Sequence, residues 1–234
     1  MRISSLIGFA TLGIAGLGGI DAQASKPTPH PTIRAMAGAT PVSELQAGKT
    51  ALLVIDFQNE YFPGGRMPIA DADSALRQTR RLIDLADRHR IRVIHVQHVL
   101  PAGAPLFAEG GNTVKFVDAM QPRQGELVVK KDAVSVFAGA SAATIEKALK
   151  EAGADTLIIA GLQTHACVAG AARDAAARGY QVIVSSDATA TRDLDLRDGS
   201  RVGAAQLHAS ALAEIEDTFG DVLSADQILS LPVR

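Results

Sequence analysis

The sequence predicts an α/β protein, a three-layer sandwich in which a mostly parallel six-stranded sheet is flanked by helices on both faces. Short unbroken apolar runs alternate along the chain with longer helical segments. This alternation is typical of parallel strands that are buried on both faces and covered by helices. The 234 residues, 47% of them hydrophobic, suffice for one sizeable core and are too few for two large domains.

Each strand is predicted by a run of Val, Ile, Leu or Ala. The first run ends in Asp56, so its apolar residues are followed at once by an acid. A run without polar alternation indicates a strand that is buried on both faces. The predicted strands are residues 51–55, 91–96, 127–129, 156–160, 181–184 and 222–223.

The helices are predicted by apolar residues that recur every three or four positions. In the first helix, Leu76, Leu82 and Ile83 fall on one face, with charged residues on the other. Gly153 and Gly179 follow the second and third helices, where a glycine commonly adopts the left-handed conformation that ends a helix. The predicted helices are residues 73–89, 141–152, 164–178 and 202–219.

Residues 1–24 are predicted to be a signal peptide. Arg2 precedes an apolar stretch at residues 6–20, and a small-x-small cleavage site ends at Ala24. The stretch is shorter than the roughly 20 residues of a membrane span, so we expect an exported protein, periplasmic or secreted, with a retained anchor as the alternative. Residues 25–48 contain four prolines and predict an extended leader. Residues 49–234 predict the folded domain.

Composition narrows the classes of function. The formal net charge of −2 provides no basic field for nucleic acid, and we expect no membrane binding after signal cleavage. The chain has no Trp, two Tyr and seven Phe, too few for a surface that stacks bases or sugars. Cys167 is the only cysteine, so it is a buried inert thiol, half of an intermolecular bridge or a reactive group.

Chemically active residues follow several of the predicted strands. Asp56 follows the first strand, His98 the second, Lys130 and Lys131 the third, and the segment 161–167 the fourth. The carboxyl ends of parallel strands share one edge of a sheet, and ligands bind at that edge in such folds. We therefore expect these side chains to lie close together.

Cys167 is placed near the start of a predicted helix, whose N-cap we expect to be Thr164. Free N–H groups and the positive end of the helix dipole would favour a thiolate there and could receive an oxyanion. Asp56 would accept the thiol proton and return it to a leaving amine, and Lys131 would keep Asp56 ionised. The alternatives are that Asp56 only caps a turn and that Lys131 is only a solvated strand end.

The chain from residue 51 to about residue 229 resembles the isochorismatase-like cysteine hydrolase superfamily, which includes nicotinamidases and N-carbamoylsarcosine amidases. The segment 161–168, GLQTHACV, is similar to the family's G-[VIL]-x-T-x-x-C-V signature. Residues 54–58 and 131–137 are similar to the motifs that carry the family's aspartate and lysine.

The resemblance implies the residues of the site. A catalytic triad would consist of Asp56, Lys131 and Cys167, and Lys131 is preferred to Lys130 because its spacing to Phe137 fits the family pattern. The resemblance also implies a homo-oligomer. It further implies an oxyanion hole, formed by the N–H groups of Ala166 and Cys167. Finally, it implies a cis peptide bond between Leu162 and Gln163.

Nicotinamidases carry an Asp-x-His metal-binding motif after the second strand, and this chain departs from it. The matching stretch, residues 97–100, is Gln-His-Val-Leu, and His95 and His98 would project to opposite faces of a strand. We therefore expect no metal and no cofactor. The expected substrate pocket consists of residues on or near the sheet edge: Phe62, His98, Phe107, Phe137, Gln163 and His165.

These observations favour a cysteine hydrolase that cleaves a C–N bond of a small amide or carbamoyl compound through a thioacyl intermediate. One alternative is a vinyl-ether hydrolase of the isochorismatase type, which resembles this fold and does not use a thiol. The other is a noncatalytic binding or oligomeric scaffold, in which the thiol would be buried and inert.

Overall fold

A computed structural model describes residues 29–234, and one compact unit begins at Pro31 and runs to the carboxyl terminus. The predicted signal peptide and the first four residues of the predicted leader lie outside the described residues.

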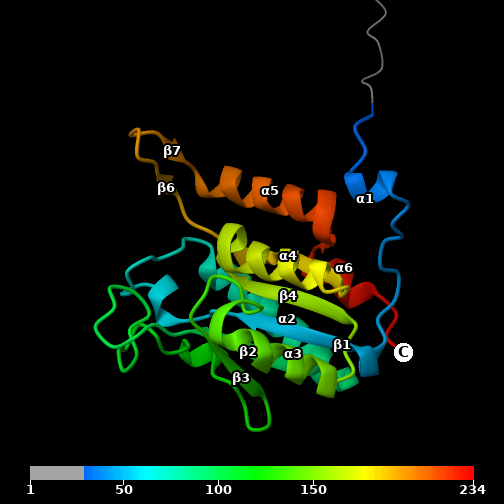
Figure 1. The fold of residues 1–234 in the computed structure, drawn as a ribbon, viewed down its shortest axis with the longest axis horizontal. Coiled ribbons are helices and arrows are strands. Elements are labelled where there is room, and N and C mark those ends of the chain that lie inside the picture. Colours follow the sequence, from blue (N-terminus) through cyan, green and yellow to red (C-terminus); the bar gives the residue numbers. More distant parts are fainter. Residues whose placement is uncertain (1–28) are drawn as a thin grey trace, which may run out of the picture. The chain divides into compact units, whose positions relative to one another are not determined.

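A six-stranded parallel sheet forms the centre of this unit (Figure 1). Its strand order is β3-β2-β1-β4-β5-β8, and every neighbouring pair is parallel. The predicted α/β sandwich is therefore confirmed. The strands are β1 (Thr50–Ile55), β2 (Arg92–His98), β3 (Leu127–Lys131), β4 (Thr156–Leu162), β5 (Gln181–Ala190) and β8 (Asp221–Leu223), with a separate antiparallel pair β6 (Leu194–Asp195) and β7 (Arg201–Val202).

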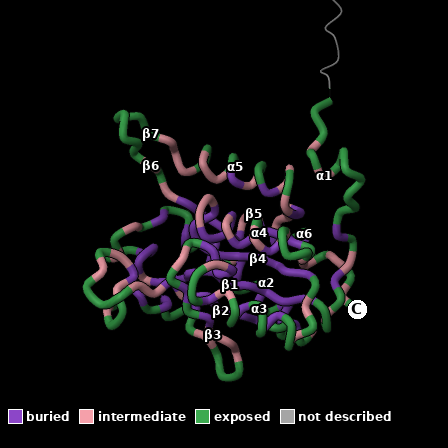
Figure 2. The backbone as a smooth tube through the Cα atoms, viewed as in Figure 1, coloured by how far each residue is buried: buried purple, intermediate pink, exposed green. Residues whose placement is uncertain are grey.

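Helices cover both faces of the sheet. One apolar cluster joins one face to α2 and α6, and a second cluster joins the other face to α3 and α4. Figure 2 shows the strands as the buried layer between them. The helices are α1 (Ile33–Met36), α2 (Ala72–His89), α3 (Ala142–Glu151), α4 (Ala169–Ala177), α5 (Ala204–Glu214) and α6 (Ala225–Ser230).

The region after β4 differs most from the prediction. β5 continues to Ala190, six residues beyond its predicted end. Its register against β4 shifts on the way, since Ile159 pairs with Val184 and Gly161 pairs with Thr189. Pairing with β4 resumes after this shift. α5 begins at Ala204 rather than at residue 202, and the Asp193 carboxylate accepts a hydrogen bond from the Ala204 N–H at 2.7 Å. The short helix α6 was not predicted, although Ser224 and Gln227 form a capping box at its start.

The described part of the predicted leader packs on the domain. Leu45 is fully buried and pairs with Val233, and the Arg34 guanidinium forms an ion pair with Asp221 at 2.7 Å. The compact unit therefore begins well before residue 49. Within residues 29–234, none of the helices is both long and apolar enough to cross a membrane.

Gly161 provides a test of the irregular junction at the end of β4. Its φ of +142° is unfavourable for any residue with a Cβ, and a Cβ there would overlap the backbone of Ile55. We expect Gly161→Ala to lower the free energy of unfolding by about 2 kcal/mol or more, measured by urea denaturation. Gly48→Ala is the matched control, because Gly48 is exposed and has open space around its Cα. An equal effect of the two substitutions would contradict this account.

Candidate active site

Asp56 leaves β1 in a conformation that turns its carboxylate into the sheet edge. Its φ is +55°, a left-handed value that aspartate tolerates better than most residues, and its N–H donates to the Val96 carbonyl at 3.0 Å. The side chain is fully buried. Neither carboxylate oxygen receives a well-aligned hydrogen bond from any described residue.

The Lys131 ammonium is the centre of the site. It lies 2.9 Å from Asp56 Oδ2, 2.9 Å from His98 Nδ1, 3.3 Å from Cys167 Sγ and 3.2 Å from the Ala133 carbonyl oxygen. Burial by itself lowers the pKa of Lys131, but the negative charge of Asp56 outweighs burial and the pKa is raised. Lys131 is therefore cationic at neutral pH.

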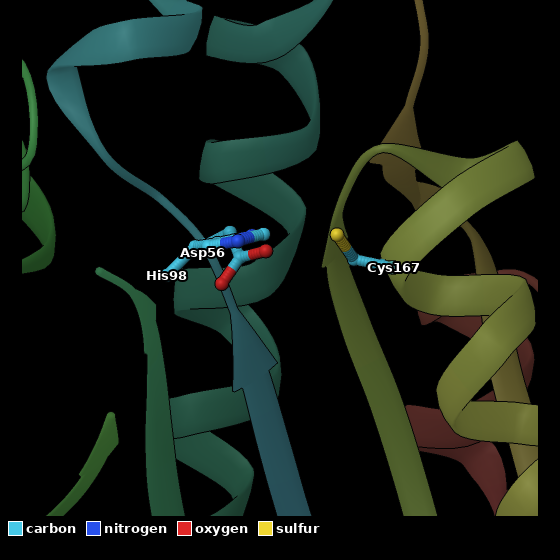
Figure 3. Close-up of side chains that lie close together, drawn as sticks. All are labelled: Asp56, His98 and Cys167. Atoms are coloured by element: carbon cyan, nitrogen blue, oxygen red, sulfur yellow. The ribbon is translucent and has the colours of Figure 1, made fainter. Parts of the chain in front are cut away.

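Cys167 approaches from the opposite side of the edge. Figure 3 shows its sulfur directed from the start of a helix toward Asp56, with His98 next to the carboxylate. One ligand atom from each of these three residues lies within 4.8 Å of the others. Because Lys131 contacts both Asp56 and Cys167, the three side chains predicted to form a triad, which come from three separate segments, lie together.

The turn that carries Cys167 is π-helical rather than α-helical. It spans Thr164–Val168, and its N-cap is Gln163, so the expectation that Thr164 is the N-cap is wrong. The Thr164 hydroxyl does not cap the helix because it is bonded to His208 Nδ1 at 2.8 Å.

The backbone of this turn leaves an amide for the reaction. The Gln163 carbonyl accepts the N–H groups of Ala166 and Val168, at 3.1 and 3.2 Å, and omits that of Cys167 between them. The Leu162–Gln163 peptide bond is cis. Two amides are expected to bind an oxyanion. The Ala166 N–H already donates to the Gln163 carbonyl, whereas the Cys167 N–H does not.

The thiol is protonated in this arrangement. Burial raises the pKa of Cys167 to about 12, assisted by the negative charge of Asp56 and opposed by Lys131. This direction is opposite to the one expected from the helix dipole, because burial and the facing carboxylate oppose the ammonium and the dipole. Proton removal has to accompany nucleophilic attack.

His98 and Phe107 form one wall of the site. Their rings are stacked with centroids 4.6 Å apart, and the Glu60 carboxylate accepts the Phe107 N–H at 3.2 Å. Burial lowers the pKa of His98, and the Lys131 charge lowers it further. A neutral His98 therefore accepts a hydrogen bond from Lys131.

Phe137 does not lie in the pocket, contrary to the prediction. Its ring packs on Tyr180 and under the Arg178 guanidinium, 5.2 Å from the ring centre, at the carboxyl-terminal end of α4. Cys167 is at the opposite end of that helix. Phe62 is buried in the apolar cluster on the α2 face of the sheet.

Three residues that sequence analysis missed border the site: Tyr61, Thr191 and Arg192. Burial raises the pKa of Tyr61, and the negative charge of Asp56 raises it further, so the hydroxyl stays protonated. Thr191 donates to Gln163 Oε1 at 3.4 Å and contacts His165 Nδ1 at 2.6 Å. The strand-edge rule would have found Thr191 and Arg192 if β5 had been predicted at its full length.

Asp56, His98 and Cys167 also have the spacing of metal ligands. The Lys131 ammonium contacts all three, so a cation could bind them only by displacing it. His95 instead contacts Glu126 at 3.0 Å, away from His98. The expectation of a site that functions without a metal remains a prediction.

Comparison with known proteins gives consistent matches. The family model described as the Isochorismatase domain matches residues 50–227. The secreted isochorismatase effector Isc1 of Verticillium dahliae is 34% identical over 84% of this chain and 98% of its own. The maleamate amidohydrolase of Pseudomonas putida is 29% identical, covering 75% of this chain and 83% of its own. The crystal structure of an isochorismatase from Pseudomonas putida has a TM-score of 0.74 at 28% identity, covering 85% and 98% of the two chains.

The charges around Cys167 predict how its reactivity changes. We expect Asp56→Asn to lower the pH at which iodoacetamide labels Cys167 and Lys131→Met to raise it, because the carboxylate raises the thiol pKa and the ammonium lowers it. Intact-protein mass spectrometry over a pH series measures the labelling rate. Lys130→Met is the matched control, since Lys130 is exposed on the neighbouring position. Slower labelling of Asp56→Asn than of the wild type would refute this assignment of the charges.

Proposed function

The chain belongs to the isochorismatase family of hydrolases, and we propose that it is a cysteine hydrolase that cleaves a C–N bond of a small amide or carbamoyl compound through a thioacyl intermediate. The observation that carries this proposal is the contact of one ammonium with a carboxylate at 2.9 Å and with a thiol sulfur at 3.3 Å. This arrangement supplies a base, a nucleophile and a charge that stabilises the nucleophile.

The first step joins proton transfer to attack. As Cys167 Sγ bonds to the substrate carbonyl carbon, its proton passes to the Asp56 carboxylate. Lys131 stabilises the negative charge that develops on sulfur. The carbonyl oxygen becomes an oxyanion, which accepts hydrogen bonds from the N–H groups of Cys167 and Ala166.

The second step expels the leaving group. The tetrahedral intermediate collapses, the C–N bond breaks, and the nitrogen takes the proton from Asp56 and leaves as ammonia or an amine. A thioester to Cys167 remains. Asp56, again a carboxylate, then removes a proton from water as the water oxygen attacks the thioester, and Cys167 leaves as a thiol with that proton.

We further propose that the substrate carries a carboxylate that binds Arg192. The guanidinium Nε is buried and has no hydrogen-bond partner among the described residues, and Nη1 donates to the Asp193 carbonyl at 3.1 Å. Arg192 follows Thr191, which is bonded to Gln163 beside the catalytic turn. Arg192 is half-buried, and a guanidinium with a buried, unpaired Nε suits a planar anion. Maleamate, named for the Pseudomonas putida relative, is an amide of this kind.

The name of the Verticillium dahliae relative favours a second candidate, hydrolysis of the vinyl ether isochorismate. That reaction requires a proton donor and water and does not require a thiol. Cys167 would then be dispensable, which separates the two functions. The same relative is named as secreted, which supports the proposal that residues 1–24 direct export. A homo-oligomer is likewise proposed from the family.

We expect Cys167→Ala to abolish release of ammonia or amine from an amide panel, by 10³-fold or more, roughly the loss seen when a nucleophile is removed. Cys167→Ala should remain folded, because it removes one buried atom. Wild-type protein treated with a substrate should show an acyl adduct on Cys167 by mass spectrometry, and chelators should leave the rate unchanged. Full activity of Cys167→Ala on isochorismate would favour the vinyl-ether reaction instead.

If Arg192 binds a substrate carboxylate, its substitution should affect charged amides more than neutral ones. We expect Arg192→Gln to lower kcat/KM about 10- to 100-fold for amides with a carboxylate and to leave neutral amides little affected, because a charge-assisted hydrogen bond is lost. Steady-state kinetics on paired charged and neutral amides measures the difference. Arg197→Gln, an exposed change in the β6–β7 hairpin, serves as the control. Equal losses on both kinds of amide would count against a carboxylate subsite.

A further inference from the structure

His208 links three elements through its two ring nitrogens. It belongs to α5, its Nδ1 is 2.8 Å from the Thr164 hydroxyl, and its Nε2 is 3.1 Å from the Ser186 carbonyl oxygen. A carbonyl oxygen can only accept, so Nε2 carries a hydrogen. In a neutral ring Nδ1 is then an acceptor, and the Thr164 hydroxyl donates to it.

The irregular course of β5 makes this link possible. Ser186 lies in the segment where the register between β4 and β5 shifts, between Val184 and Thr189. Its carbonyl accepts the hydroxyl of Thr189 and the His208 ring instead of a strand neighbour. The Ser186 carbonyl is therefore a fixed acceptor, and it selects the tautomer of His208 that carries its hydrogen on Nε2.

Thr164 is the first residue of the π turn that carries the nucleophile. It is fully buried, and its carbonyl accepts the Ala169 N–H across the turn. A π turn has poorer hydrogen-bond geometry than an α-helix and depends on its surroundings. A shift at Thr164 would move Cys167, three residues along the same turn, relative to Asp56 and Lys131.

The surroundings favour the neutral ring. Burial lowers the pKa of His208, while the Ser186 carbonyl and the charge of Asp71 partly oppose this effect. Asp71 and Asp187 are the charged groups that line the cavity of about 320 Å³ next to His208. The ring is only half-buried, so acid can still protonate it.

We propose that His208 is a positioning residue for Cys167, whose neutral ring accepts the Thr164 hydroxyl and so holds the turn from which the thiol attacks. Protonation would place a hydrogen on Nδ1 and reverse this bond, so that the ring would donate to the Thr164 hydroxyl. This inference rests on the proposed function wherever turnover is the readout, but the alkylation rate of Cys167 tests it without turnover.

Two pairs of substitutions separate the contacts. His208→Asn places a side-chain oxygen near the Nδ1 position and cannot be protonated, whereas His208→Gln places its amide near Nε2 and gives Thr164 no matched acceptor. Thr164→Ser keeps the hydroxyl and Thr164→Val removes it. Gln206→Ala, an exposed change on α5, controls for effects of altering the helix.

We expect His208→Gln and Thr164→Val to lower kcat about 10- to 100-fold with KM little changed, because each removes a buried hydrogen bond. Both substitutions should also change the rate of Cys167 alkylation. His208→Asn and Thr164→Ser should stay within about threefold of the wild type by both measures. If no amide is turned over, the proposed function fails while the alkylation rates still decide this inference. Unchanged kcat and alkylation in folded His208→Gln and Thr164→Val would overturn it.

Discussion

The buried ion pair between Lys131 and Asp56 constrains the rest of the site. Both side chains have no exposed surface, and moving an ammonium and a carboxylate out of water costs several kcal/mol for each ion. That cost is offset only if the partners stay in contact, so the ends of β1 and β3 must hold a fixed separation. β2 lies between them, and His98 is the register partner of Lys131. The long lysine side chain spans this gap and makes the two charges one unit.

The same pair governs the thiol. Asp56 attracts the ammonium and disfavours a thiolate, while Lys131 stabilises the thiolate. Because the carboxylate and burial prevail, the nucleophile is released only as Asp56 takes its proton. A thiol of this kind is a weak nucleophile until a carbonyl carbon is in place, since the thiolate is the reactive form. The ion pair therefore couples nucleophile activation to substrate binding.

Several irregular backbone features lie where the chemistry is. The left-handed Asp56, the positive φ of Gly161, the shifted register of β5 and the π turn all lie at the carboxyl edge of the sheet. At the opposite ends of the strands, β1 pairs with β2 and β4 in unbroken register. Regular pairing gives rigidity, and departures from it aim side chains and amides at one point, as is common at functional sites.

The sequence by itself determined the strands, most of the helices and which side chains follow each strand. These features depend on local patterns, because apolar runs and helical periodicity are properties of neighbouring residues. It also indicated Asp56, Lys131 and Cys167, since the carboxyl ends of parallel strands share an edge. Only the tertiary structure decided the protonation of the thiol, the position of Phe137 at the far end of α4 and the roles open to Arg192 and His208. Those properties arise from burial and from contacts between residues distant in sequence, such as Thr164 and His208, and no local pattern encodes such distances.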